Sequence, residues 1–566
     1  MKAKLLFTAA LFASLCANAQ EDFTNGVFIV NEDWYGHNNS TINYFDYTKP
    51  EGEQWMYRVF QAVNSGRELG CTNQYGQIYG DRFLLIAKQE KDPGAQITGG
   101  RITIADAKTM KLMAQSTLID PSGNSCDGRA VIGIDSFKAY VSSSNGVWIL
   151  DLTQNRTVRQ IEGTGNDTGS LYSAQCGSMV RVNNYVFVAH QQKGLLVIDT
   201  ESDRLVNVID MTPVDNFAGK SGAGIGSVVL AKDGMLYVSV TSDTNGYGDA
   251  LPYLMKVNPV TFETSAIEIP NDMYPPANSW YAWTPDGFCS AVHENALYWN
   301  GGENSWFSGS KIFKYDIDNN MVTKIIDLDE EGQGWQLYGC SMRPHPLTGE
   351  LYLSLYKDFG STTYNLRRTD HNGSLLGQYD MIKNYWFPSL PVFPDNYGPE
   401  IHNLAEQIVS PSETTIISLK GWATDMDNLD AGIVKRVAGN VDGAFTASIV
   451  NGDLVIKPYT STVPEGKHSI RIEANSNGKY AYGNVDINFG SSGVDYIENP
   501  EFAGISINGK QITVNNHAGE VCNIYNMSGS LVYSESVEDD TVTFVPEINT
   551  GLYIVVVGKD RAKLVF

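Results

Sequence analysis

Short runs of alternating apolar and polar residues, each ended by glycine, asparagine or aspartate, recur along the first two thirds of the chain. Residues 26–46 read GVFIVNEDWYGHNNSTINYFD, which predicts a strand, a polar and aromatic loop, and a second strand that ends in aspartate. The same order returns six more times, up to ELYLSLYKDFGSTTYNLRRTDHNGSLL at 350–376. Seven units of about 54 residues each therefore lie between residues 21 and 395.

A single unit of this kind cannot cover both faces of its own sheet, whereas seven four-stranded units packed radially cover one another. The pattern predicts an all-β protein with a seven-bladed β-propeller. Alternating strands with NGD and SNGK turns continue beyond it to about residue 490 and predict a small antiparallel sandwich. Further strands follow the linker GSSGVDYIENPE, so we expect two small C-terminal β-sandwich domains in all. We expect a signal peptide over 1–19, the propeller over 20–397, an immunoglobulin-like sandwich over 398–490 and a C-terminal β domain over 491–566.

Extrapolation of the repeat predicts how the ring closes. One unit back from Cys71 falls at the start of the mature chain, so the first blade lacks an inner strand of its own. One unit forward from Cys340 falls near Pro391. We therefore expect residues 385–394 to complete the blade that residues 26–60 begin.

Five cysteines recur before the first strand of a unit, and glycine takes their place in the fifth unit at Gly226. They are Cys71, Cys126, Cys176, Cys289 and Cys340. The inner strands of a propeller line its central channel. Because the five cysteines occupy equivalent positions on these strands, we expect them to form a partial ring near one mouth of the channel. Three readings stay open: a small side chain that fits a crowded level, one or two disulfides permitted by export, or a metal site.

Loops that lead into the inner strands and loops that join second to third strands open on the same face of a propeller. Large aromatic residues gather in these loops among amides and hydroxyls, which suits a flat or polyhydroxylated ligand; the alternative is that the rings only pack between long loops. The candidate ligand-binding residues on this face are Trp34, Tyr35, His37, Lys88, His190, Gln191, Tyr247, Trp283, Trp306, Trp335, Tyr356 and Trp386.

The sequence offers little for catalysis. It has no G-x-S-x-G elbow, phosphate-binding loop or dinucleotide-binding turn in the required context. His37 and His190 are the histidines that could bind a metal across neighbouring loops, but no carboxylate pair or H-x-x-x-H spacing accompanies them, so we expect no metal and no cofactor. Asp425, Asp427 and Asp430 form either a solvated turn or a Ca²⁺ site, without the EF-hand spacing.

The N-terminus predicts export. Lys2 and Lys4 precede an apolar run from Leu5 to Leu15 and the small-x-small triplet 17–19, as in a cleaved signal peptide, so the mature protein should start near Gln20. Loss of these two lysines takes the net charge from −24 to −26. Nucleic acids and anionic membranes bind basic surfaces, so we expect neither as a partner of this strongly acidic chain.

The opening FIVNEDWYGHNNSTINYFD and the strand-turn-strand LLVIDTESDRLV resemble the YncE-like seven-bladed propellers of bacterial cell surfaces, over about two thirds of the chain. That group includes surface proteins that bind cobalamin and pass it to an outer-membrane transporter. The resemblance implies a corrinoid or another bulky nutrient as ligand and a transporter as partner, without assigning individual binding residues.

The last 70 or so residues resemble the C-terminal domain that directs type IX secretion. Asn526 to Gly529, Gly551 to Val555 and Lys563-Leu564 match its plan, and the ending KLVF departs from it. The resemblance implies a secreted protein that reaches the cell surface or the medium. Three functions stay open: a non-enzymatic ligand-binding propeller, an exported lyase or lactonase that uses the same face, and a protein-protein adhesion module.

Overall fold

The computed structural model describes residues 22–166, 174–211, 224–241, 250–276, 287–302, 308–439, 441, 444–490, 504–508, 510–526, 529–549, 551–558 and 560–565. The chain divides into two compact units. The first unit consists of Met1–Ala405, Ile416–Ile456 and Ser469–Asp486, and the second of Glu406–Thr415, Lys457–His468 and Ile487–Phe566. The first unit thus combines the propeller with most of the domain that follows it.

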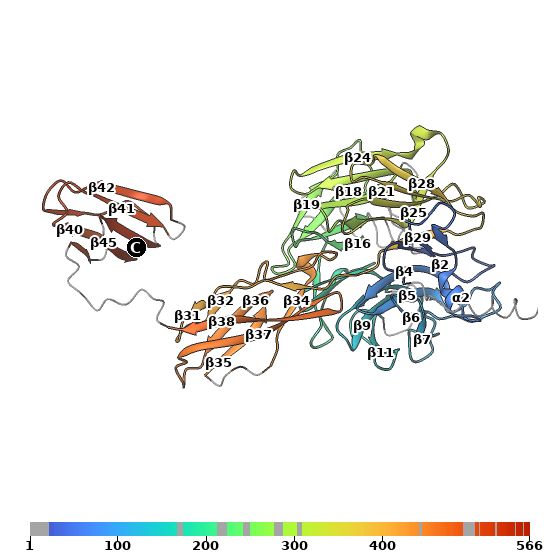
Figure 1. Cartoon of the computed structure of the whole chain (residues 1–566), viewed down its shortest axis with the longest axis horizontal. Helices are drawn as coiled ribbons and strands as arrows, with labels where there is room; N and C mark the ends of the chain where they lie inside the picture. Colours follow the sequence, from blue (N-terminus) through green and yellow to red (C-terminus); the bar gives the residue numbers. More distant parts are fainter. Residues whose placement is uncertain are drawn as a thin grey trace, which may run out of the picture. The chain divides into compact units, whose positions relative to one another are not determined.

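Seven antiparallel sheets form the blades in the described part of the chain, as predicted (Figure 1). Their strands carry apolar residues at alternating positions that face the neighbouring blades. In blades two to four the strands are β4 (Cys71–Tyr79), β5 (Arg82–Gln89), β6 (Ile102–Asp106) and β7 (Leu112–Ser116); β8 (Gly128–Gly133), β9 (Lys138–Ser143), β10 (Val147–Asp151) and β11 (Arg156–Gln160); and β12 (Cys176–Val182), β13 (Tyr185–His190), β14 (Gly194–Asp199) and β15 (Arg204–Ile209).

Blades five to seven follow the same order, from the innermost strand outward. Their strands are β16 (Gly224–Leu230), β17 (Leu236–Thr241), β18 (Ala250–Val257) and β19 (Thr264–Glu268); β20 (Cys289–Ser290), β21 (Ala296–Gly301), β23 (Lys311–Asp316) and β24 (Met321–Asp327); and β25 (Gln336–Pro344), β26 (Leu351–Tyr356), β27 (Asn365–Thr369) and β28 (Leu375–Asp380), with β22 (Ser308–Gly309) added beside β25. The described residues also contain the short helices α2 (Val59–Val63), η2 (Leu328–Glu331) and η3 (Asp430–Gly432).

The first blade combines both ends of the propeller sequence, which confirms the predicted closure. Its sheet has the order β29-β1-β2-β3, formed by β29 (Pro388–Val392), β1 (Val27–Asn31), β2 (Thr41–Phe45) and β3 (Trp55–Met56). The innermost strand β29 pairs with β1 so that Leu390 lies opposite Val30. The Ser389 hydroxyl also donates to the Val30 carbonyl at 3.2 Å, which ties the strand to its neighbour.

Buried apolar clusters join each blade to the next around the whole ring. Val197 and Val238 belong to the cluster between the fourth and fifth blades, and Ile29 and Tyr352 to the one between the first and seventh. Equivalent clusters hold the other five seams. Because every blade buries both faces in this way, the ring needs all seven units.

Two smaller β domains follow the propeller, as predicted. The first contains β31 (Gln407–Val409), β34 (Val434–Val437), β37 (Gly466–Ser476) and β38 (Lys479–Phe489) in one sheet, β32 (Thr415–Ile417), β35 (Phe445–Val450) and β36 (Asp453–Pro458) in another, and the pair β30 (Glu400–Ile401) and β33 (Ala423–Thr424). The last contains the sheets β39 (Ile505–Asn508), β40 (Gln511–Asn515) and β43 (Thr541–Phe544), and β41 (Val521–Asn526), β42 (Leu531–Ser536), β44 (Leu552–Val557) and β45 (Asp560–Val565). One apolar core, which includes Val514 and Val555, lies between these last two sheets.

Two segments of the middle domain contact the propeller within the first unit, and we call them the cap: residues 428–434 with η3, and the turn 475–478 between β37 and β38. The amide of Gly80 donates to the Asn477 carbonyl at 2.8 Å, and the Asn477 side chain donates to the Ile78 carbonyl at 2.9 Å. Leu429 packs on the apolar cluster of the fourth and fifth blades. The cap therefore sits where the inner strands end.

The described cysteines are all buried thiols. The sequence predicts that those of the inner strands lie at one depth along the channel, and this holds for only some of them. Cys71 and Cys176 begin their inner strands, and Cys176 pairs with His190 at the last position of β13. Cys289 instead pairs with Tyr298, the third residue of β21, and Cys340 lies inside a register shift between Leu337 and Met342. These two cysteines therefore lie deeper in the channel. The spacing of the repeats could not predict this, because it does not record a bulge or an altered register.

In the described part of the chain, no helix has the length and apolar character needed to cross a membrane.

Candidate functional site

The strand register defines the face on which the predicted site lies, and we call it the mouth face. Cys71 pairs with Gln89 and Gln336 with Tyr356, so the start of each inner strand lies beside the end of the second strand. Loops into the inner strands and loops after the second strands therefore open on the same face, as expected. The cap contacts the opposite ends of the inner strands, at Ile78 and Gly80.

An exposed group of aromatic side chains lies on the mouth face over the first and seventh blades, and we call it the rim. Trp34 is 37% exposed and stacks on His37, with ring centres 3.7 Å apart. Its other neighbour is Tyr385, at 4.0 Å. Tyr35 and Phe359 are 59% and 54% exposed. Of these residues, Trp34, Tyr35 and His37 were predicted, whereas Tyr385 and Phe359 were missed.

Other predicted aromatic residues lie on this face but are buried. Trp386 stacks on Tyr57 at 5.4 Å and donates from Nε1 to the Ile382 carbonyl at 2.8 Å. Tyr356 packs edge-on against Tyr338 at 5.7 Å. Trp335 is 4% exposed, and the Lys357 ammonium lies 4.6 Å from the centre of its ring. In this structure these three rings support the loops, and their role in ligand binding stays a prediction.

Tyr247, Trp283 and Trp306 lie outside the described residues. The described parts of the mouth face belong mainly to the first four blades and the seventh.

Polar side chains from five blades surround the mouth beside the rim, and we call them the mouth ring: Glu32, Gln74, Lys88, Arg129, Gln175, Gln191 and Tyr338. The Gln74 amide donates to the Glu32 carboxylate, and the Tyr338 hydroxyl donates to the same group at 3.3 Å. Arg129 donates to Gln175 at 2.8 Å, and Gln175 donates to Gln191 at 3.2 Å. The mouth therefore presents donors and acceptors that are held in place by one another.

Burial changes the acid-base properties of two groups of the mouth ring. It raises the pKa of Glu32, although Lys88 and the two hydrogen bonds favour the charged carboxylate. It lowers the pKa of Lys88, and the neighbouring Arg129 acts in the same direction. A carboxyl and an amine whose pKa values both move toward neutrality are a frequent feature of functional sites.

Local backbone irregularities redirect two side chains of the mouth ring, and they explain why Gln74 was not predicted. The register of β4 shifts between Asn73 and Tyr75, and that of β8 between Gly128 and Ala130, so Gln74 and Arg129 are the extra residues. A bulge breaks the alternation of a strand and redirects a side chain. The only signal in the sequence is that a polar residue follows each cysteine closely, as in CTNQ and CDGR.

The two histidines considered as a metal pair do not come together. His37 belongs to the loop after β1 in the first blade, whereas His190 ends β13 in the fourth. His190 is fully buried, and its Nδ1 accepts the amides of Gln192 and Lys193 at 3.0 and 3.1 Å. Burial lowers the pKa of His190 to about 4. This imidazole is therefore neutral and closes a turn.

No group of three or more potential metal ligands occurs within the described ranges. Of the acidic run, Asp427 accepts the backbone amides of Asn396 and Tyr397 at 2.7 and 3.1 Å. Asp425 accepts the Asp427 amide at 3.1 Å. These carboxylates hold a turn beside the cap.

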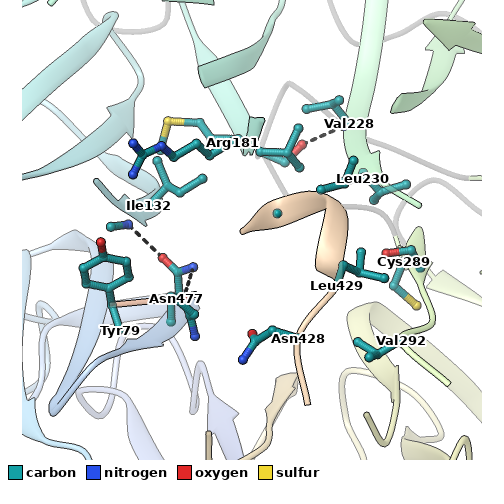
Figure 2. Close-up of a pocket in the computed structure, with 18 of the residues that line it drawn as sticks. Tyr79, Ile132, Arg181, Val228, Leu230, Cys289, Val292, Asn428, Leu429 and Asn477 are labelled. Carbon is teal, nitrogen blue, oxygen red and sulfur yellow. Dashed lines mark hydrogen bonds between the residues drawn. The ribbon is translucent and has the colours of Figure 1, made fainter. Parts of the chain in front are cut away.

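A cavity of about 360 Å³ occupies the channel between its middle and the cap (Figure 2). The inner strands supply one wall through residues such as Tyr79, Arg181 and Val228, and the cap supplies Leu429 and Asn477. This volume lies within the usual range of small-molecule sites. The cavity was not predicted.

The seven blades, the closing strand and the polar channel define an all-β protein of the propeller class. Residues 25–394 match the family described as "Domain of unknown function (DUF5074)", and the chain belongs to that family. The match ends two residues beyond β29, so the family unit includes the strand that closes the ring.

Two solved structures match part of the chain at low similarity. A quinonprotein alcohol dehydrogenase-like protein from Bacteroides thetaiotaomicron is 17% identical, with 66% of this chain and 79% of that chain covered and a TM-score of 0.48. A mutant of the Synechocystis apocarotenoid oxygenase is 10% identical, with 66% and 93% covered and a TM-score of 0.38. Similarity this distant carries no argument about activity. None of the curated proteins compared with the chain matches it.

Proposed function

We propose that the protein is an exported, non-enzymatic ligand-binding propeller that captures a bulky nutrient, such as a corrinoid or a glycan, at the mouth face. The observation that carries the proposal is the exposed Trp34 stack beside the mouth ring. Exposed aromatic faces supply apolar area and stacking, and fixed donors such as Arg129 and Gln175 orient a polar ligand.

The proposed location and partner rest on the sequence. The N-terminal signal pattern and the C-terminal likeness to type IX sorting domains support passage across the outer membrane. The likeness to YncE-like surface propellers supports an outer-membrane transporter as the partner that receives the ligand.

A binding assay on the mature full-length chain tests the main proposal. Trp34→Ala removes an exposed ring, so it should leave folding intact and weaken the binding of cyanocobalamin or of a hit from a glycan panel about tenfold, measured by titration calorimetry. Tyr459→Ala removes an aromatic residue that is 45% exposed in the middle domain, and it should bind as the unchanged protein does.

Equal affinity of the Trp34→Ala variant, or no binding by the unchanged protein, would contradict the proposal. A protein partner captured without any small ligand would favour the adhesion function instead.

A second candidate, an exported lyase or lactonase, is favoured by one observation: the facing groups Glu32 and Lys88 have opposite pKa shifts that suit acid-base exchange. Mass spectrometry of the ligand after incubation separates the two functions. Recovery of unchanged ligand supports binding. Turnover that Glu32→Gln abolishes supports the enzyme.

A further inference from the structure

The cavity at the capped end of the channel is unusual in its charge. The chain has 64 acidic and 40 basic residues, yet the described residues that line this cavity include two arginines and no Asp or Glu. The arginines are Arg181 on β12 and Arg343 on β25. Within the described part of the chain, neither forms an ion pair with a carboxylate.

Arg181 is held rigidly and is 8% exposed. Its Nε donates to the Asn183 carbonyl at 3.1 Å, and its Nη1 donates to the Ile134 carbonyl. Its Nη2 is buried and has no hydrogen-bond partner. Burial lowers the pKa of Arg181, and the neighbouring Arg436 acts in the same direction, whereas Tyr79 and Asp135 act against it, so its positive charge is only partly compensated. Figure 2 shows Arg181 on the wall of the cavity, above Ile132.

Arg343 reaches the cavity from the seventh blade. Its Nη1 donates to the Met342 carbonyl at 2.8 Å, and its Nη2 lies 3.5 Å from the Cys340 sulfur. A guanidinium has five N–H donors, so most of the hydrogen-bonding capacity of Arg343 is left for an occupant of the cavity.

The acids near this end of the channel already accept hydrogen bonds, and Asp135, which acts on Arg181, accepts the Phe137 amide at 2.8 Å. Asp395 and Asp427 line a neighbouring cavity of about 240 Å³, which Arg343 also lines. Asp395 pairs with Lys479, and Asp427 accepts the amides of Asn396 and Tyr397. They are therefore poor counter-charges for the two arginines.

The remaining polar lining is neutral and supplies hydroxyl and amide groups, from Tyr75, Gln77, Ser178, Ser227, Ser290 and Asn475. A water molecule has a share of about 30 Å³ in the liquid, so the cavity holds about a dozen waters or a small organic molecule.

We propose that the capped end of the channel is a second binding site, which takes a small organic oxyanion through Arg181 and Arg343. A buried guanidinium without a counter-charge is costly, and an anion removes that cost. Guanidinium forks bind carboxylate and phosphate oxygens in the same geometry, and the neutral lining suits a hydroxylated body. This site lies at the opposite end of the channel from the mouth ring, so it stands apart from the ligand proposed there.

Thermal unfolding of the mature full-length protein tests the proposal after overnight incubation with phosphate, sulfate, citrate or glucuronate at constant ionic strength. At least one of these anions should raise Tm by about 5 °C at saturation. The Tm shifts caused by the four anions show whether the site prefers phosphate-type or carboxylate-type ligands. Arg343→Met and Arg181→Met should each raise the half-saturating concentration about tenfold or more.

Two further variants keep the result interpretable. Arg343→Lys retains the charge but loses the fork, so it should bind better than Arg343→Met and worse than the unchanged protein. Arg204→Met removes an exposed arginine from β15 and should leave the anion-induced shift unchanged. The proposal is overturned if none of the four anions shifts Tm, or if Arg343→Met and Arg181→Met respond as the unchanged protein does.

Discussion

Asp33 shows how a single residue supports the mouth face. Its φ is 57°, in the left-handed region, and its amide donates to the Trp386 carbonyl at 3.0 Å, so it joins the loop after β1 to the segment before β29. Its carboxyl is 3% exposed and accepts the Thr41 hydroxyl at 2.6 Å. Burial raises the pKa of Asp33 to about 8, so the group is mostly protonated at neutral pH.

The Asp33→Asn variant should therefore be more stable at alkaline pH. Since the pKa of Asp33 is higher in the folded than in the unfolded chain, the folded protein retains a proton that the unfolded chain releases between about pH 4 and 8. Its contribution to stability is present below this range and is lost as the pH rises through it. Asparagine does not titrate and tolerates positive φ. At pH 9 the variant should exceed the unchanged protein by at least about 1.4 kcal/mol, the value of one pK unit.

Urea unfolding between pH 5 and 9 measures this difference, with the exposed Asp81→Asn as the matched control. A difference between variant and unchanged protein that stays constant over this range would show that Asp33 is not a buried, protonated carboxyl.

For the residues of the candidate site, the sequence predicts the face on which they lie but not how exposed they are. The repeat predicted Trp34, Trp335 and Trp386 on one face because strand order alone determines which loops share it, and their role in ligand binding stays a prediction. It could not distinguish the exposed Trp34 from the buried Trp386, since burial depends on contacts such as the Tyr57 stack, which come from another part of the fold.

At the scale of elements, the turn between β37 and β38 is held in close contact with the second blade. Gly478 has a φ of +86°, and a Cβ on it would lie 2.6 Å from the Gly80 amide nitrogen. Gly80 itself has a φ of +62°. The two backbones can approach only because both residues lack side chains.

Gly478→Ala should therefore disrupt the contact between the cap and the second blade. The variant should be about 2 kcal/mol less stable than the unchanged protein, from strain and lost contacts. Gly421→Ala is the matched control, because Gly421 has a φ of +72° with nothing within 4 Å, so it changes only the backbone preference.

Hydrogen exchange at residues 76–80 and thermal unfolding measure the effect. Faster exchange at these amides in Gly478→Ala, but not in Gly421→Ala, is the expected result. Equal behaviour of the two variants would mean that the close approach is unimportant.

The cap could not have been derived from the sequence. The blades can be predicted because their sequence pattern repeats. The position of the closing strand can be predicted by extending that repeat one unit beyond Cys340. The contact between Gly80 and Asn477 instead joins residues that belong to different domains and share no pattern. The internal cavity depends on that contact, so it was missed for the same reason.

At the scale of the whole molecule, the proposed export signals make a prediction about location. Deletion of residues 491–566 removes the domain that resembles type IX sorting domains and lies outside the first unit. In a host with that secretion system, most of the shortened protein should stay inside the outer membrane, as measured by protease accessibility on intact cells. The mature N-terminus should lie near Gln20 by mass spectrometry.

Val545→Ala changes an exposed residue of the same domain and should reach the surface normally. Surface exposure of the deletion variant at the level of the unchanged protein would show that the last domain does not direct secretion.

The closing strand also determines when the ring can form. The Ser389 to Val30 hydrogen bond joins residues 359 positions apart, so the first blade stays incomplete until nearly the whole propeller sequence is available. Contacts this distant in sequence form slowly. A chain that leaves the cytoplasm N-terminus first would therefore remain open during its passage, and the fold would close as a unit only after the last blade had arrived.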